Sequence, residues 1–201
     1  MNKSITKDEI ALLPIRAFEG KINIPLTDSE IQSAVDYLRQ YKVIGFDTET
    51  RPCFRKGQHN QVALLQLSAG DEAFLFRINK IKLPECVKSL LADSSIAKVG
   101  AAIHDDLKGL KKISPFEPAN FIDVQTIAKS FGIENLGLKP LAALLMGFRI
   151  SKAQQTSNWE IQYLTEAQKL YAATDAWVSL EIYNKLLEYN NMSIDSPAGD
   201  E

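Results

Sequence analysis

The chain has 201 residues, of which 45% are hydrophobic, so it can form one well-buried domain and is neither disordered nor fibrous. Its 23 basic and 25 acidic residues give a formal net charge of -2, which excludes a global positive field but not a locally basic groove. Cys53 and Cys86 form no CxxC pair, and no apolar run approaches the roughly 20 residues that span a bilayer, which indicates a cytoplasmic protein without membrane association.

The first half of the chain predicts an arm, a helix and antiparallel strands. Residues 1–26, with prolines at 14 and 25, are typical of an N-terminal arm lying over the domain. Thr27 to Glu30 has the pattern of a helix start, and apolar residues then recur at helical spacing as far as Tyr41. Three apolar runs predict strands, the last two joined by a tight turn: 43–46, 62–67 and 72–78.

The second half alternates helices with strands, which is typical of parallel units. We predict strands over 97–101 and 121–124, and helices over 84–93, 106–113, 125–131 and 138–146. A long last helix over 165–189 has Thr165 as N-cap with Gln168 three residues on. Residues 190–201 are predicted to form a disordered tail. The fold class is therefore α/β, with a mixed central sheet whose first strands are antiparallel, in one domain over 27–189.

The strand Val43-Ile-Gly-Phe-Asp-Thr-Glu-Thr50 ends in two carboxylates. Side chains two apart on a strand share a face, so Asp47 and Glu49 are predicted to lie side by side where water is scarce. They repel each other unless a positive group lies between them. An alternative is that these acids only cap the next turn.

A third carboxylate interrupts the last helix. One predicted core stripe of this helix is apolar throughout and consists of Leu170, Ala173, Trp177, Leu180, Tyr183 and Leu187. The second inward stripe contains an acid and consists of Tyr171, Asp175, Val178, Ile182 and Leu186. A buried carboxylate needs a donor, a cation or a metal. Tyr171, one turn before Asp175, is either an ordinary core residue or a hydroxyl for the same site.

Asp105 and Asp106 follow the strand over 97–101, and the spacing does not choose between them. Ligands of open α/β sheets gather at the carboxyl ends of strands. Three segments would then bring oxygen ligands to one place, and such ligands suit Mg²⁺ or Mn²⁺. The positive group between Asp47 and Glu49 is therefore predicted to be a divalent cation, whose charge keeps both acids ionised.

Three stretches carry a resemblance to a known family: Asp47-Thr-Glu49, Ile103-His-Asp-Asp106-Leu and Tyr171-Ala-Ala-Thr-Asp175. They resemble the three motifs of the DEDD superfamily of 3′-to-5′ exonucleases, in its tyrosine-bearing branch. The resemblance implies an RNase H-like fold with helices on both faces of the sheet, and a nucleic acid with a free 3′ end as partner. It favours Asp106 over Asp105.

The same resemblance implies a role for each acid. Asp47 would bridge two Mg²⁺ or Mn²⁺ ions, Glu49 and Asp175 would complete the nucleophile-side site, and Asp106 would hold the other ion. Tyr171 would orient the attacking water. The expected function is hydrolysis of DNA or RNA from the 3′ end by two metal ions, with no obligate protein partner. The alternative is an inactive nucleic-acid-binding module of the same fold.

Cations near polar segments are candidates for holding the phosphates of the strand. They are Arg55, Lys56, Lys139 and Lys152. Trp159 and Trp177 are predicted to pack in the core, and Asp123 to cap a helix.

Overall fold

The computed structural model describes residues 2–53 and 60–194. Six strands form one sheet in the order β1-β4-β3-β2-β5-β6. Their bounds are β1 Lys21–Asn23, β2 Val43–Thr50, β3 Val62–Ala69, β4 Glu72–Phe76, β5 Ala97–Gly100 and β6 Phe121–Asp123. β2, β3 and β4 pair antiparallel, whereas β5 and β6 extend the sheet in parallel from β2. The predicted mixed sheet is confirmed.

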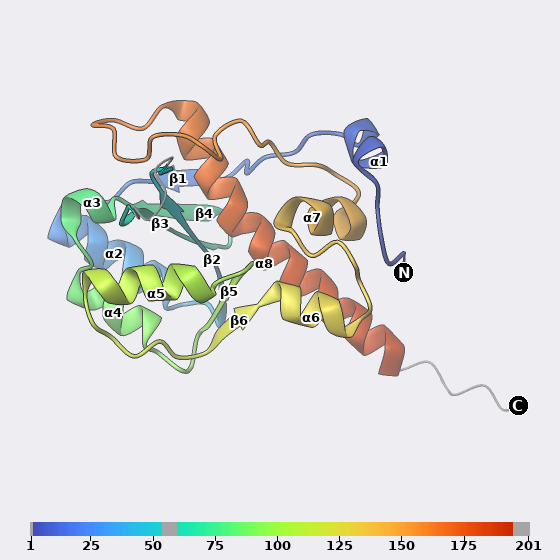
Figure 1. Ribbon diagram of the computed structural model, residues 1–201. Helices are drawn as coiled ribbons and strands as arrows, with labels where there is room; N and C mark the ends of the chain where they lie inside the picture. Colours follow the sequence, from blue (N-terminus) through green and yellow to red (C-terminus); the bar gives the residue numbers. More distant parts are fainter. Residues whose placement is uncertain (1, 54–59, 195–201) are drawn as a thin grey trace, which may run out of the picture.

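Helices cover both faces of the sheet, as Figure 1 shows. Their bounds are α1 Lys7–Leu12, α2 Asp28–Leu38, α3 Ile78–Ile81, α4 Glu85–Leu91, α5 His104–Ile113, α6 Val124–Ser130, α7 Leu138–Met146 and α8 Glu166–Ile194. On one face α2, α4 and α5 pack in a core that contains Leu38, Phe46 and Leu90. On the other face α8 crosses the sheet with α6 and α7 beside it, around Val99, Leu141 and Val178. None of the helices in the described part of the chain is long and apolar enough to span a membrane.

Helix starts follow the predicted capping. Thr27 accepts a hydrogen bond from the Glu30 amide at 3.3 Å, and the Glu30 carboxylate accepts one from the Thr27 amide at 3.0 Å. Thr165 and Gln168 form the same reciprocal pair at the start of α8. Asp123 caps α6 by accepting from the Gln125 amide at 2.9 Å. These three starts confirm the predictions made from local sequence.

Four expectations need correction. The segment over 1–26 is not only an arm, because Lys21–Asn23 pairs in parallel with β4 and forms one edge of the sheet. In the last helix Leu170 and Leu187 are each 40% exposed and do not belong to the core. That helix also continues to Ile194, beyond its predicted end at 189. Finally, α5 begins at His104, two residues before its predicted start at 106.

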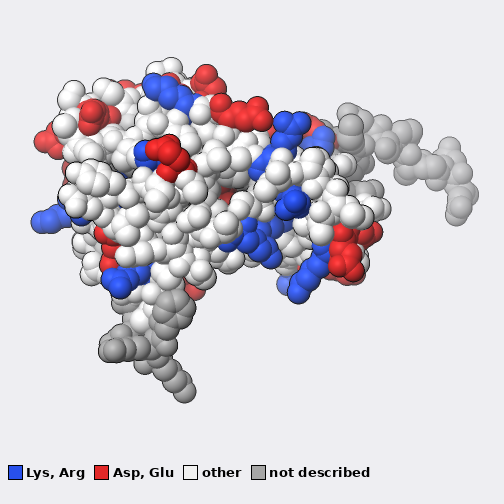
Figure 2. Space-filling view, turned by 90° about the horizontal axis from the view of Figure 1, so that it is seen from above, with Lys and Arg blue, Asp and Glu red and all other residues white. Residues whose placement is uncertain are grey.

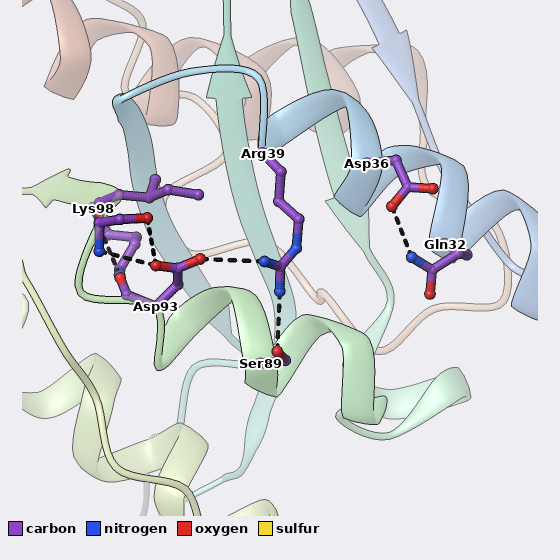
Figure 3. A network of polar contacts seen from close by, with 8 residues as sticks. Gln32, Asp36, Arg39, Ser89, Asp93 and Lys98 are labelled. Carbon is purple, nitrogen blue, oxygen red and sulfur yellow. Dashed lines mark hydrogen bonds and ion pairs between the residues drawn. The ribbon is translucent and has the colours of Figure 1, made fainter.

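A polar network between the end of α2, α4 and β5 holds the segment that leads into β5 (Figure 3). The Lys98 ammonium is buried and donates to the carbonyls of Asp93 and Ile96 at 2.7 and 2.8 Å. Burial lowers the pKa of Lys98 to about 8. Arg39 of α2 in turn contacts the Asp93 carboxylate at 3.2 Å and the Ser89 hydroxyl at 3.0 Å. The network therefore joins α2, α4 and β5, and β5 leads directly to the helix that carries Asp106.

Candidate active site

β2 presents Asp47 and Glu49 toward the face of the sheet that α8 covers. Glu49 lies opposite Leu64 in the β2–β3 register, and Leu64 packs in one cluster with Tyr171 and Ala172 of α8. Asp47, two residues earlier, points the same way because strand side chains alternate. The register shifts between Glu49 and Thr50, so regular pairing ends directly after the second acid.

α8 comes unusually close to β2 because residue 45 is glycine. A Cβ atom added at Gly45 would lie 2.0 Å from the backbone oxygen of Ala176, a distance that no side chain tolerates. The facing positions on the helix are also small, since Ala172 and Ala176 are fully buried. This close approach brings Asp175, the neighbour of Ala176, down to the two acids of β2.

The carboxylates of Asp47, Glu49 and Asp175 form a compact group. One oxygen from each lies within 4.8 Å of the others. Asp175 is 5% exposed, and its Oδ1 is buried with no hydrogen-bond partner among the described residues. Three hard oxygen donors, one of them orphaned, fit a divalent cation such as Mg²⁺ or Mn²⁺. Arginine is absent from the group, since neither acid of β2 nor Asp175 forms an ion pair with any described residue.

Burial of these acids raises their pKa values. Burial, followed by the charge of Asp175, raises the pKa of Asp47 well above its usual range. The same two causes raise the pKa of Glu49 to about 9. Burial raises the pKa of Asp175 to about 6, although a hydrogen bond from Tyr171 and the charge of Lys139 act against it. A bound cation would supply the charge that reverses these shifts.

Asp106 approaches the group from α5 but lies outside it. The Thr48 hydroxyl, on the strand between Asp47 and Glu49, donates to Oδ1 of Asp106. Asp106 is half-buried, and its charge contributes to the raised pKa of both β2 acids. Asp105 is exposed instead. The structure thus brings together three of the four predicted acids tightly and holds the fourth at their edge.

The acids open into a cleft of about 540 Å³ whose walls include Lys139, Lys152, Gln125 and Gln155. The Lys139 Nζ lies 5.6 Å from the ring centroid of Tyr171 and has no hydrogen-bond partner among the described residues. Figure 2 shows basic side chains gathered in the right-hand half of the face seen from above. The other two predicted phosphate contacts, Arg55 and Lys56, lie outside the described residues.

Tyr171 lines the cleft with its hydroxyl close to Asp175. Its ring is held by Trp159, whose centroid is 6.0 Å away and whose side chain is fully buried. Burial and the charges of Asp175 and Glu49 raise the pKa of Tyr171, so the phenol stays neutral at physiological pH. Trp159 and Trp177 both pack against aromatic neighbours, as predicted.

Two further residues lie beside the acids without having been predicted from the sequence, Thr48 and Gln66. Gln66 lies opposite Asp47 in the β2–β3 register, is fully buried and has no hydrogen-bond partner for either amide atom among the described residues. Gln66 could have been noticed in the sequence, because it is the polar residue within the apolar run 62–67. Thr48 gave no signal, because its contact with Asp106 depends on where α5 packs.

Comparison with known proteins identifies the family. A family profile described as 3′-5′ exonuclease matches residues 22–189 of this chain. This chain belongs to the 3′-5′ exonuclease family. The resemblance predicted from the three motifs is thereby confirmed.

Similar proteins agree with this membership. The mouse bifunctional 3′-5′ exonuclease/ATP-dependent helicase WRN is 32% identical over 196 residues, covering 92% of this chain and 14% of that protein. The crystal structure of Escherichia coli RNase D, described as an exoribonuclease involved in structured RNA processing, shares 28% identity and a TM-score of 0.78, with 88% of this chain and 47% of that chain covered.

The Aedes aegypti Nibbler EXO domain has the same fold, with a TM-score of 0.79 at 22% identity over 90% of this chain and 93% of that chain. The predicted fold class is therefore confirmed for this member of the exonuclease family. The chain spans less than half the length of the curated relatives it matches.

Proposed function

We propose that this protein is a metal-dependent 3′-to-5′ exonuclease that removes nucleotides from the 3′ end of DNA or RNA with two divalent cations. The observation that carries the proposal is the group formed by Asp47, Glu49 and Asp175, whose oxygens lie within 4.8 Å of one another. Such a cluster is unfavourable without a cation, because burial raises the pKa of all three acids and the charge of Asp175 further raises those of Asp47 and Glu49. Membership of the 3′-5′ exonuclease family supports the same activity.

Each residue of the cleft has a proposed task. Asp47 would be shared between two ions, Glu49 and Asp175 would complete the site on the nucleophile side, and Asp106 would hold the other ion. When bound, the ions would supply an activated water and stabilise charge on the leaving 3′ oxygen. Tyr171, as a neutral phenol, donates a hydrogen bond that fixes the direction of the attacking water.

The remaining groups of the cleft bind the strand. Lys139 and Lys152 line the cleft beside the acids and provide positive charge for the phosphates next to the scissile bond. Arg55 and Lys56 remain predicted contacts of the same kind. The proposed partner is therefore a nucleic acid with a free 3′ end. From the cysteine pattern we propose that the enzyme acts in the cytoplasm.

The test is degradation of an oligonucleotide labelled at its 5′ end, in Mg²⁺ or Mn²⁺. We expect a ladder that shortens by one nucleotide at a time, and a loss of about 100-fold or more in Asp47→Asn. Asp105→Asn is the matched control, because Asp105 is an exposed acid next to Asp106. Equal digestion by the wild type and Asp47→Asn would contradict the proposal, and absence of digestion by both would favour an inactive binding module.

A further inference from the structure

A second pocket, of about 420 Å³, lies where α3 and the start of α8 meet the segment over 161–164. Three of its lining residues are the cations Arg77, Lys80 and Lys169, and no carboxylate lines it among the described residues. The nearest acid to Lys169 is Glu166, on the adjacent turn at 2.6 Å, whose own side chain is 89% exposed. The pocket is therefore basic in a protein whose net charge is negative.

Arg77 is the feature that points to a ligand. It is 4% exposed, and it forms no ion pair with any carboxylate of the described residues. Its guanidinium donates to the carbonyl of Ile161 and, at 3.4 Å, to that of Gln162, while its Nε is buried without a partner. A buried cation without a counter-charge is unfavourable. An anion in the pocket would supply the missing charge and a partner for Nε.

The rim of the same pocket is aromatic and apolar. Tyr163 is 79% exposed and Leu26 is 56% exposed, and both line the pocket beside Lys80 and Lys169. An exposed ring next to cations matches the way proteins hold single strands, with bases stacked on aromatic side chains and phosphates on lysine or arginine. The combination fits a nucleotide better than a purely apolar partner.

The pocket and the carboxylate cleft are joined by one short segment. Trp159 and Leu164 pack in one cluster with Tyr171, and Tyr163 lies between them in the sequence. In Figure 1 this segment runs directly into the start of α8. Lys169 precedes Asp175 by six residues of α8, which is about 9 Å along the helix axis. This axial separation is within the length of a few nucleotides of single strand, at about 3.4 Å each.

We propose that this pocket is a second nucleic-acid subsite, which holds a phosphate and a base of the single strand whose 3′ end lies in the carboxylate cleft. This inference rests on the proposed exonuclease function and adds a binding determinant for longer strands. Arg77 and the two lysines hold the phosphate, and Tyr163 stacks on the base.

The test compares a 12-nucleotide strand with a dinucleotide, which occupies only the cleft. Binding of the fluorescein-labelled 12-mer is measured by fluorescence anisotropy in EDTA at several salt concentrations. Hydrolysis of both substrates is measured separately in Mg²⁺. We expect the double variant Lys80→Ala/Lys169→Ala to bind the 12-mer about tenfold more weakly and to lower the magnitude of the slope of log K against log salt by roughly 0.7, the value for the one phosphate that the pocket holds. Its hydrolysis of the dinucleotide should stay within about twofold of the wild type.

Two matched variants make the result specific. Lys185→Ala removes a lysine of the same helix that is likewise paired with an acid three residues away, and it should bind as the wild type does. Tyr163→Ala should weaken binding of the 12-mer by roughly 5- to 100-fold, whereas Tyr163→Phe, which keeps the ring, should not.

Unchanged 12-mer binding in the double variant and in Tyr163→Ala would overturn the subsite. Equal losses on the dinucleotide would overturn it too, because they would place the effect in the cleft. Failure of the wild type to hydrolyse either substrate would refute the exonuclease proposal, and the anisotropy in EDTA would still decide whether the pocket binds the strand.

Discussion

Replacing Asp175 by asparagine tests how much the charge of this acid destabilises the folded protein when no metal is bound. Asparagine has nearly the same shape, so the packing of α8 on β2 is kept while the charge is removed. Burial raises the pKa of Asp175 to about 6, against the hydrogen bond from Tyr171 and the charge of Lys139. In an unfolded chain the pKa of an aspartate is about 3.9. The native state without metal therefore holds this proton more tightly than the unfolded state does.

The pH dependence of stability follows from the coupling between proton binding at Asp175 and folding. The stabilisation from a raised pKa is fully present below about pH 4 and is lost as the pH rises through about 6. A difference of roughly two pKa units corresponds to about 3 kcal/mol in the free energy of unfolding. In EDTA, Asp175→Asn should thus gain about 3 kcal/mol relative to the wild type between pH 4 and pH 8.

The assay is urea unfolding in EDTA, followed by circular dichroism at several pH values. Asp36→Asn is the control, because it makes the same substitution on the exposed face of α2, away from the cluster, where Asp36 accepts a hydrogen bond from Gln32 at 2.8 Å. Saturating Mg²⁺ should stabilise the wild type more than Asp175→Asn. If the difference in the free energy of unfolding between Asp175→Asn and the wild type were constant or fell as the pH rises, the Asp175 charge would not destabilise the metal-free protein.

Three further substitutions test the surroundings of the acids. Gly45→Ala places a Cβ 2.0 Å from the Ala176 oxygen, so we expect a loss of about 1–3 kcal/mol in stability and weaker Mn²⁺ binding by calorimetry; an unchanged melting temperature would contradict this. Tyr171→Phe keeps the packed ring but removes the hydroxyl, so turnover should fall roughly 10- to 100-fold with little change in substrate binding; wild-type turnover would show that the hydroxyl has no role. Gln66→Met replaces an amide without partners among the described residues and should raise the free energy of unfolding by about 1–2 kcal/mol in EDTA; a lower urea midpoint would argue that the amide is satisfied by water.

Local sequence predicted the elements whose cause is local. The capping pairs at Thr27 and Thr165 specify two helix starts within four residues each, and the antiparallel strands follow a tight turn at Gly70. The edge strand Lys21–Asn23 was missed because three residues show no alternation and their partner, β4, lies about fifty positions further on. Such a pairing depends on the packed sheet and has no signature in the segment itself.

The acids of the site were predictable because each contradicts its surroundings. Asp47 and Glu49 end an apolar strand, and Asp175 interrupts a buried helical stripe. The spacing could not choose between Asp105 and Asp106, since both lie in the first turn of α5 and only the packing of that helix turns Asp106 to the cleft. The exposure of Leu170 and Leu187 was missed for a related reason, because a helical repeat does not say how wide the buried stripe is.

Through the contact between Thr48 and Asp106, the strand β2 both carries two of the acids and positions a third acid on another element. Asp47 and Glu49 of β2 face α8, whereas Thr48 between them donates a hydrogen bond to Asp106 of α5. The positions of Asp47, Glu49 and Asp175 therefore depend on the fit of a helix on a strand, whereas that of Asp106 depends on the packing of α5 and on the Thr48 hydroxyl. Substituting valine for Thr48 would remove this hydrogen bond alone, which offers a way to perturb Asp106 while leaving the other three acids in place.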